Sequence, residues 1–280
     1  MPMKTASGQA LKFDEAAGWS NVCKLCEIDT FLWTYFYRRK EETHMPGYIL
    51  HLTAARMYLD QLPPDDPLRC DPKQQNDFFA GNLIPDSVRD KSRSHFRDPA
   101  YIDRMIEWPH PDRFLEKYRD FTGNAGCRGY WFHLYIDRRF FRDYIPTAAE
   151  FLDENGADTD RRDKAAYVLL KKSGEKVAVS QYLSEEYYYG DYTRLNTWLL
   201  KRYRLPDVLE PVEDPGIEEV DYRDLEKVLE ELRGYRGVPE EAAEHLKVFD
   251  REELLRFLES AARTAHYEWT RKTAGVTAHT

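Results

Sequence analysis

The most constraining feature of this sequence is a pair of polar residues on the apolar face of a predicted helix. Between Gly129 and Ile145 hydrophobic residues recur at helical spacing, and Pro146 follows. His133 and Asp137 lie four residues apart in this segment, so both project from its apolar side. A buried carboxylate without a partner costs several kcal/mol, and a cation, a metal or a dense set of hydrogen bonds is the usual remedy. The fold must therefore neutralise Asp137.

Three further residues are candidate partners for this pair. His51 lies beside the apolar stripe of a helix predicted over residues 46–62, which a Pro-Pro pair ends. Asp86 and His95 lie nine residues apart in a connection that contains proline and serine, where a loop can bring both toward the helices. Imidazole and carboxylate groups bind zinc and other first-row divalent metals, and an incomplete shell leaves a position for water. We therefore predict one or two zinc ions, or another divalent metal, bound by His51, Asp86, His95, His133 and Asp137.

Spacing alone leaves ordinary interpretations open. His133 and Asp137 could bond to each other and to an arginine, with His51 satisfied in the core, because HxxxD pairs are common. Cys23 and Cys26 form a lone CxxC, whereas a zinc ribbon needs a second pair, so two ordinary thiols are the simpler interpretation.

The composition limits the class of partner. A net charge of -9 over 280 residues argues against broad attraction to nucleic acid or anionic lipid. The most apolar early segment, residues 31–37, is too short for a membrane span or a secretory signal. Four scattered cysteines do not make a secreted disulfide scaffold. We expect a cytoplasmic protein without a nucleic-acid partner or stable membrane insertion, and the sequence gives no indication of its oligomeric state.

The chain divides into segments of different character. Residues 1–44 form a leader without a convincing helical pattern, and Met45 is a candidate translation start. Residues 45–204 are predicted as a helical metal-binding domain, 205–221 as an acidic, proline-rich linker, 222–268 as a C-terminal helical segment and 269–280 as a disordered tail. Strand signals are scarce, so the predicted fold class is all-α. Helices are predicted over residues 46–62, 112–123, 129–145, 147–156, 160–172, 192–203, 222–233, 239–249 and 250–267.

Four short segments, in this order, carry a family resemblance: MPGYILHL at 45–52, GNLIPD at 81–86, SHF at 94–96 and GYWFHLYID at 129–137. They resemble the bacterial zinc-dependent phospholipase C family, most closely its small cytoplasmic members, over roughly a third of the chain. The resemblance implies a multi-helix bundle of that type, here with extra C-terminal helices. It also implies one zinc on Asp86, His95, His133 and Asp137, and a second to which His51 and Asp137 contribute.

The implied activity is hydrolysis of a small phosphorylated substrate by a zinc-dependent phosphoric ester hydrolase. A metal lowers the pKa of bound water and so supplies a nucleophile, and a carboxylate that bridges two ions, Asp137 or Asp86, is the catalytic group. Basic residues close in sequence are candidates for binding the phosphate: Lys91, Arg93, Arg97 and Arg138. Asp191 begins a DYTRLN segment similar to one in the small members, so it is a candidate to approach the site, although a helix cap is the simpler role.

The sequence also departs from the family pattern. The larger enzymes carry a further His, a later HxxxE motif and a terminal tryptophan ligand, and nothing after Asp137 matches the first two. HD-type phosphohydrolases are excluded, because no His is followed by Asp. Zinc peptidases of the HExxH type are excluded, because that motif is absent. The competing function is a non-catalytic helical binding or adaptor protein whose metal site is structural or vestigial.

Overall fold

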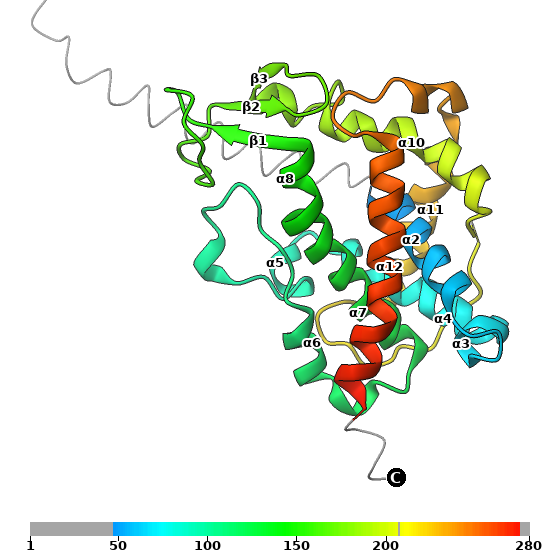
Figure 1. Cartoon of the computed structure of the whole chain (residues 1–280). Coiled ribbons are helices and arrows are strands. Elements are labelled where there is room, and N and C mark those ends of the chain that lie inside the picture. The colour runs from blue at the N-terminus through cyan, green and yellow to red at the C-terminus, as the bar shows by residue number, and fades with distance from the viewer. Residues whose placement is uncertain (1–46, 207, 275–280) are drawn as a thin grey trace, which may run out of the picture. The chain divides into compact units, whose positions relative to one another are not determined.

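Helices dominate the part of the chain that the computed structural model describes, residues 47–206 and 208–274 (Figure 1). These residues belong to a unit that begins at Met45, and the predictions for the leader, including Cys23 and Cys26, lie outside the described residues. The longer helices are α2 (Gly47–Gln61), α4 (Pro72–Leu83), α7 (Ala125–Arg139), α10 (Tyr188–Tyr203), α11 (Leu225–Gly234) and α12 (Arg251–Thr273). Shorter ones are α3 (Pro67–Cys70), α5 (Lys91–Ser94), α6 (Pro111–Lys117), α8 (Ile145–Ala148) and α9 (Val179–Tyr182). The 3-10 turns are η2 (Ile84–Ser87), η3 (Pro99–Tyr101), η4 (Arg119–Phe121), η6 (Tyr222–Asp224), η7 (Tyr235–Gly237) and η8 (Glu240–Glu244), and η5 (Phe140–Tyr144) is a π-helical turn.

Helices α4 and α7 pack with their backbones almost in contact. A Cβ atom added to Gly81 of α4 would lie 1.9 Å from the carbonyl oxygen of Gly126 in α7. One added to Gly129 of α7 would lie 2.1 Å from the carbonyl oxygen of Phe78. Only glycine permits such an approach, because any side chain would clash with the opposite backbone. The two helices therefore form a closely spaced pair at the centre of the unit.

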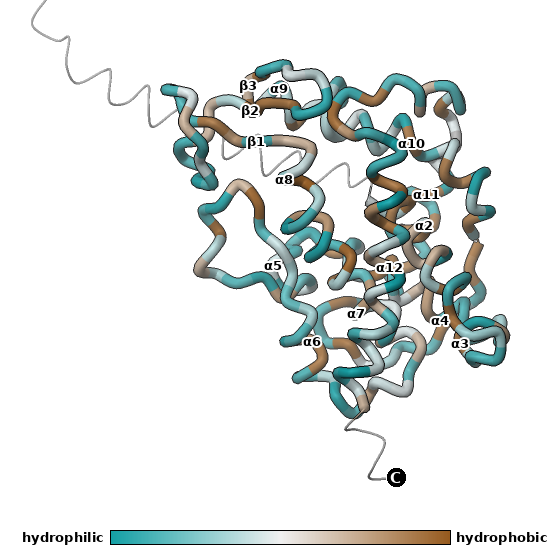
Figure 2. Tube along the Cα trace, in the orientation of Figure 1, coloured by the Kyte–Doolittle hydropathy of each residue, from teal (hydrophilic) through white to brown (hydrophobic). Residues whose placement is uncertain are grey.

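Helix α12 packs beside one member of this pair, α7, and along α2. It contacts both α2 and α7, and its buried Trp269 lies 5.1 Å from Trp131 of α7, measured between ring centroids. Hydrophobic and hydrophilic residues alternate along it in Figure 2, as expected for a helix that buries one face. Asp250 caps the helix, because its side chain accepts a hydrogen bond from the Glu253 N–H at 2.9 Å. The helix continues to Thr273, so the tail predicted over 269–280 does not begin at 269.

A small antiparallel sheet corrects the all-α prediction. Its strand order is β1-β2-β3, with Ala149 opposite Leu170 and Val168 opposite Val177. The fold is therefore mostly helical with a three-stranded sheet, and two segments predicted as helices, 147–156 and 160–172, contain strands instead. Each strand is too short for its alternation of buried and exposed residues to outweigh a helical spacing in the sequence. The strands are β1 (Ala149–Leu152), β2 (Tyr167–Leu170) and β3 (Lys176–Ala178).

Other predicted boundaries shift for local reasons. The helix predicted at 129–145 begins earlier, after the Asn124 cap, and runs through η5 and α8 to Ala148. The helix predicted from Asp112 begins slightly earlier, since the N-cap position of α6 is His110 and Asp112 lies in the first turn. Within 239–249 the only described helical element is the short turn η8.

The segment predicted as a linker packs against the rest of the unit. Leu205 and Ile217 are both buried, so parts of 205–221 contribute to the core. Within the described residues, no helix combines the length and apolar character that crossing a bilayer requires.

Candidate metal centre

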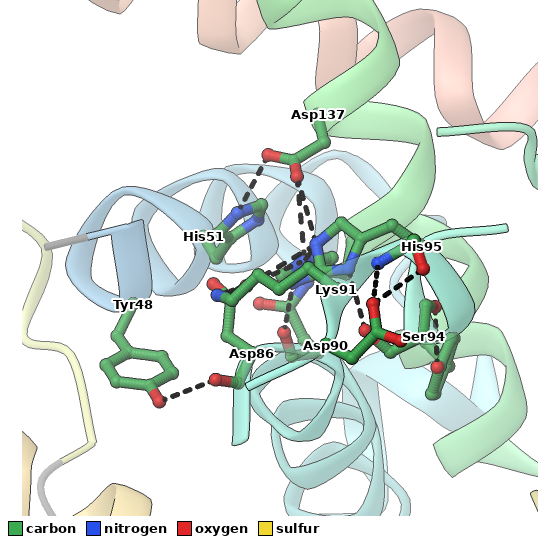
Figure 3. Close-up of polar contacts among 12 residues, drawn as sticks. Tyr48, His51, Asp86, Asp90, Lys91, Ser94, His95 and Asp137 are labelled. Carbon is green, nitrogen blue, oxygen red and sulfur yellow. Dashed lines mark hydrogen bonds and ion pairs between the residues drawn. The ribbon is translucent and has the colours of Figure 1, made fainter. Parts of the chain in front are cut away.

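The structure brings together all five side chains that the sequence suggested as ligands (Figure 3). They come from four places in the fold: α2, η2, the residue after α5, and α7. All are shielded from solvent, and the most exposed of them, the Asp137 side chain, is 14% exposed. Two overlapping groups of three could each hold an ion: His51, Asp86 and His133, and His95, His133 and Asp137.

Short local structures orient Asp86 and His95. Pro85 lies within η2, and the hydroxyl of Tyr48 in α2 donates to the Asp86 backbone carbonyl at 3.2 Å. The Asp90 carboxylate caps α5 by accepting from the Ser92 N–H at 3.0 Å, and His95 follows at the end of this helix. These contacts direct a carboxylate and an imidazole from a connecting segment toward α7.

The ligand atoms have the spacing of a coordination shell. Four atoms face one another, and five of their separations lie between 3.1 and 3.8 Å. A tetrahedral zinc with ligands at about 2.0–2.2 Å places neighbouring ligand atoms roughly 3.3–3.6 Å apart. The five separations bracket this range, although Asp86 and Asp137 belong to different groups of three. The four atoms are His95 Nε2, His133 Nε2, Asp86 Oδ1 and Asp137 Oδ2.

The position of one proton follows from the contacts of His133. Its Nδ1 lies 2.8 Å from the Asn82 carbonyl oxygen, which can only accept, so Nδ1 carries the proton and Nε2 presents a lone pair. His133 Nε2 lies 3.1 Å from His95 Nε2. Two lone pairs at this distance repel, and either a proton on His95 Nε2 or a cation between the rings removes the repulsion. The donor set thus fits a bound metal ion.

Ser94 contacts Nδ1 of His95, just as the Asn82 carbonyl contacts Nδ1 of His133. The Ser94 hydroxyl lies 2.9 Å from His95 Nδ1, and the Tyr130 hydroxyl donates to the Ser94 carbonyl at 2.7 Å. Partners of this kind hold an imidazole in the orientation in which its other nitrogen can bind a metal. Sequence reasoning missed both Ser94 and Asn82, and their position next to ligand segments was the only available signal.

The two carboxylate oxygens of Asp137 contact different histidines. Oδ2 lies 3.3 Å from His95 Nε2, whereas Oδ1 lies 3.1 Å from His51 Nε2. The His51 ring stacks on His133 with 3.8 Å between centroids, and its Nδ1 is buried without a hydrogen-bond partner among the described residues. A carboxylate in this position can bridge two cations.

The electrostatics of the centre favour bound cations. Burial alone would raise the pKa of Asp137, but the neighbouring His51, His95 and His133 hold it well below its usual value. Burial, reinforced by His51, lowers the pKa of His133 to about 3, so this imidazole is neutral at pH 7. Among the described residues, no Lys or Arg pairs with Asp137. The ionised Asp137 carboxylate thus has only imidazoles as charge partners in the described structure.

Asp86 differs because a lysine contacts it. Burial raises its pKa, but Lys91, His133 and His95 together lower it well below its usual value. The Lys91 ammonium bonds Asp86 Oδ1, and Figure 3 shows this side chain extended across the centre.

Other residues that we considered for the site have different partners. Arg93 donates to the Glu218 carbonyl, Arg97 lies 3.9 Å from Glu107, and Arg138 donates to Asp112. Lys91 is thus the one residue of the four expected to bind phosphate that contacts a metal-ligand candidate in the described structure.

Asp191 also lies outside the centre. Its fully buried carboxylate accepts from three consecutive backbone N–H groups, Lys247, Val248 and Phe249, at 2.7–2.9 Å, and from Arg194. It therefore anchors the loop before α12, which corrects both the expectation that it approaches the site and the simpler one of a helix cap.

One cavity of the described structure is lined by none of the five candidate ligands. It encloses about 760 Å³, and its wall contains Tyr101, Trp108 and Phe151. Phe141, which follows Asp137 by four residues, also lines it. Comparison of the chain with protein-family models, curated proteins and solved structures gave no match.

Proposed function

We propose that this protein is a zinc-dependent hydrolase of small phosphoesters, similar in its centre to the zinc-dependent phospholipase C family. The observation that carries the proposal is the set of separations between two imidazole nitrogens and two carboxylate oxygens, 3.1–3.8 Å. That set suits zinc, which accepts nitrogen and oxygen ligands in tetrahedral geometry. The order of the sequence segments that supply these atoms supports the same family.

Each residue of the centre has a distinct task in this proposal. Asp86, His95, His133 and Asp137 hold one zinc, and His51 with the second oxygen of Asp137 contributes to another. When bound, the metal lowers the pKa of water and stabilises negative charge on the phosphoryl oxygens. Asp137, the most exposed of the five, is the carboxylate that would link the two metal positions.

The buried surroundings of the centre would strengthen the interactions between the ligands and a bound metal. The His51, His95 and His133 rings exclude water from one another, and charges interact more strongly in a dry site than in solvent. Asn82 and Ser94 fix the imidazole orientations, so little rearrangement is needed when a ligand binds.

A non-catalytic binding protein is the second candidate function. The observation that favours it is the position of the 760 Å³ cavity, whose lining includes none of the five ligands. A molecule bound there would not touch the metal, so the centre would serve stability alone.

Metal analysis combined with a substrate panel separates the two functions. Purified protein is expected to contain one or two zinc ions per chain and to hydrolyse p-nitrophenyl phosphate or bis(p-nitrophenyl) phosphate. Asp137→Ala should reduce turnover at least about a hundredfold, because it removes the carboxylate between His51 and His95. Asp143→Ala is the matched control, since Asp143 lies on η5 and pairs only with Arg139 and Arg142 in the described structure.

Two results would contradict the hydrolase. A protein that holds zinc but hydrolyses no phosphomonoester or phosphodiester of the panel would favour the binding function. Equal turnover in Asp137→Ala and wild type would place any activity elsewhere.

A further inference from the structure

Lys91 is the cation that neutralises the centre in this structure. Among the described residues, it is the only Lys or Arg whose charged group pairs with any of the five candidate ligands. The pair is nearly dry, with the Lys91 side chain 11% exposed and that of Asp86 2% exposed. In such surroundings a charge pair is only weakly screened by water and salt.

The lysine bonds the same oxygen that faces the imidazoles. Its ammonium contacts Asp86 Oδ1, and this atom lies 3.4 Å from His95 Nε2 and 3.8 Å from His133 Nε2. The other oxygen, Oδ2, points toward the start of α2, where a Cβ atom on Gly47 would lie 3.5 Å from it. Lys91 therefore occupies the oxygen that a metal shared with the two imidazoles would need.

One short helix presents both the lysine and a ligand. Lys91 is the first residue of α5, directly after the Asp90 cap, and its carbonyl accepts from the His95 N–H at 2.9 Å. The ammonium and the His95 imidazole are thus held on the same turn of backbone. Their relative position is fixed by local structure, which distinguishes this contact from an accidental surface ion pair.

We propose that Lys91 is an internal counter-ion that holds Asp86 in place without metal and competes with zinc for Oδ1. The inference rests on the metal binding in the proposed function, and it adds a residue that limits the affinity of that site. The same positive charge has two opposite effects. It stabilises the metal-free protein by compensating a buried carboxylate, and it weakens zinc binding by repulsion and by occupying a ligand atom.

Replacing the lysine by an uncharged residue of similar length tests both effects. Zinc affinity is measured by calorimetry with a competing chelator, and the Tm of the metal-free protein is measured in EDTA. Lys91→Met should lower the Kd for zinc by about tenfold or more, because a like charge at contact distance is removed. The same variant should have a lower metal-free Tm than wild type, because Asp86 loses its cation.

Lys73→Met is the matched control. Lys73 also pairs with an aspartate, Asp77 at 2.8 Å, but its side chain is 72% exposed on α4. It should leave both the zinc Kd and the Tm close to wild type. Lys91→Arg, which retains the charge, should keep the wild-type affinity within a few fold.

Lys91→Gln provides a second uncharged variant in case Lys91→Met does not fold. Unchanged or weaker zinc binding in the folded uncharged variants would overturn the counter-ion proposal, even if wild type hydrolyses phosphoesters. Zinc binding that strengthens as expected, in a protein without turnover, would support the counter-ion and contradict the hydrolase. Absence of zinc binding in wild type and all variants would overturn the metal centre itself.

Discussion

Two buried carboxylates in this protein, those of Asp191 and Asp137, have opposite surroundings. Asp191 accepts hydrogen bonds from three backbone N–H groups and pairs with Arg194 at 2.9 Å. Asp137 faces three imidazoles and, among the described residues, no Lys or Arg. The first carboxylate is satisfied by backbone N–H groups and an arginine, whereas the charge partners of the second in the described structure are imidazoles.

A third buried acid shows what burial does without such partners. Burial raises the pKa of the Cys127 thiol to about 12, so this group remains neutral. Asp137, by contrast, stays ionised because its imidazole neighbours hold its pKa well below the usual value. We therefore expect a carboxylate that the fold satisfies and a candidate metal-binding carboxylate to respond differently to substitution.

The largest effect on stability is expected for Asp191→Ala. It would leave three backbone N–H groups without their acceptor, so we expect the free energy of unfolding to fall by about 3–5 kcal/mol. Urea unfolding measures this change. The folded fraction should bind zinc with the wild-type Kd, and a large loss of affinity would mean that the two carboxylates are coupled.

Asp137→Asn should change zinc binding strongly and the stability of the metal-free protein only slightly. The amide has the same shape without the charge, so the metal-free protein should unfold within about 1 kcal/mol of wild type. The increase in Tm that zinc gives to wild type should be absent from the variant, because a ligand is lost. Thermal unfolding with and without zinc measures both quantities. Destabilisation as large as that of Asp191→Ala would show that Asp137 is satisfied by the fold alone.

Ser94→Ala should weaken zinc binding by about tenfold. The variant removes the hydroxyl that lies 2.9 Å from His95 Nδ1 and leaves every ligand in place. Ser92→Ala is the control on the same helix, since its hydroxyl donates to Asp90 and does not contact the centre. Calorimetry that gives equal Kd values for the two variants would exclude an orienting role for Ser94.

The smallest effect concerns the Cys127 thiol. Iodoacetamide at pH 8 should label the exposed Cys70 and leave Cys127 unmodified, as peptide mass spectrometry can measure. The folded thiol keeps its proton to about pH 12, whereas an unfolded thiol loses it near the ordinary value of 9.0. Stability that depends on this group should therefore decline as the pH rises above 9. Rapid labelling of Cys127 would show that its site is open to solvent.

Sequence patterns predicted five of the six longer helices from local signals, and they missed α4. The helix before the Pro-Pro pair and the one capped by Asp250 lie close to their predicted starts. The strands at Ala149–Leu152 and Tyr167–Leu170 were not predicted, because each is four residues long and gains stability from a partner distant in sequence. The conformational preferences of neighbouring residues carry no information about such a distant strand partner.

In the candidate site too, features set by local sequence were predicted and features set by distant residues were not. The position of His133 and Asp137 on an apolar face indicated that both point inward, and the structure places them there. Arg93, Arg97 and Arg138 were expected near phosphate because they are close in sequence, but their side chains bond elsewhere. Asp191 could not be interpreted correctly from the sequence, since the N–H groups that it binds lie 56 to 58 residues away.

The contact between Gly81 and Gly126 has a consequence for the chemistry of an imidazole that neither residue touches. A methyl group at Gly81 would require the two helices to separate by roughly an ångström, since its Cβ would lie 1.9 Å from a backbone oxygen. That movement would draw the Asn82 carbonyl away from His133 Nδ1, now 2.8 Å distant. The proton would then be free to move to Nε2, which is the atom that faces the centre. Residues without side chains thus select the tautomer that can bind a metal.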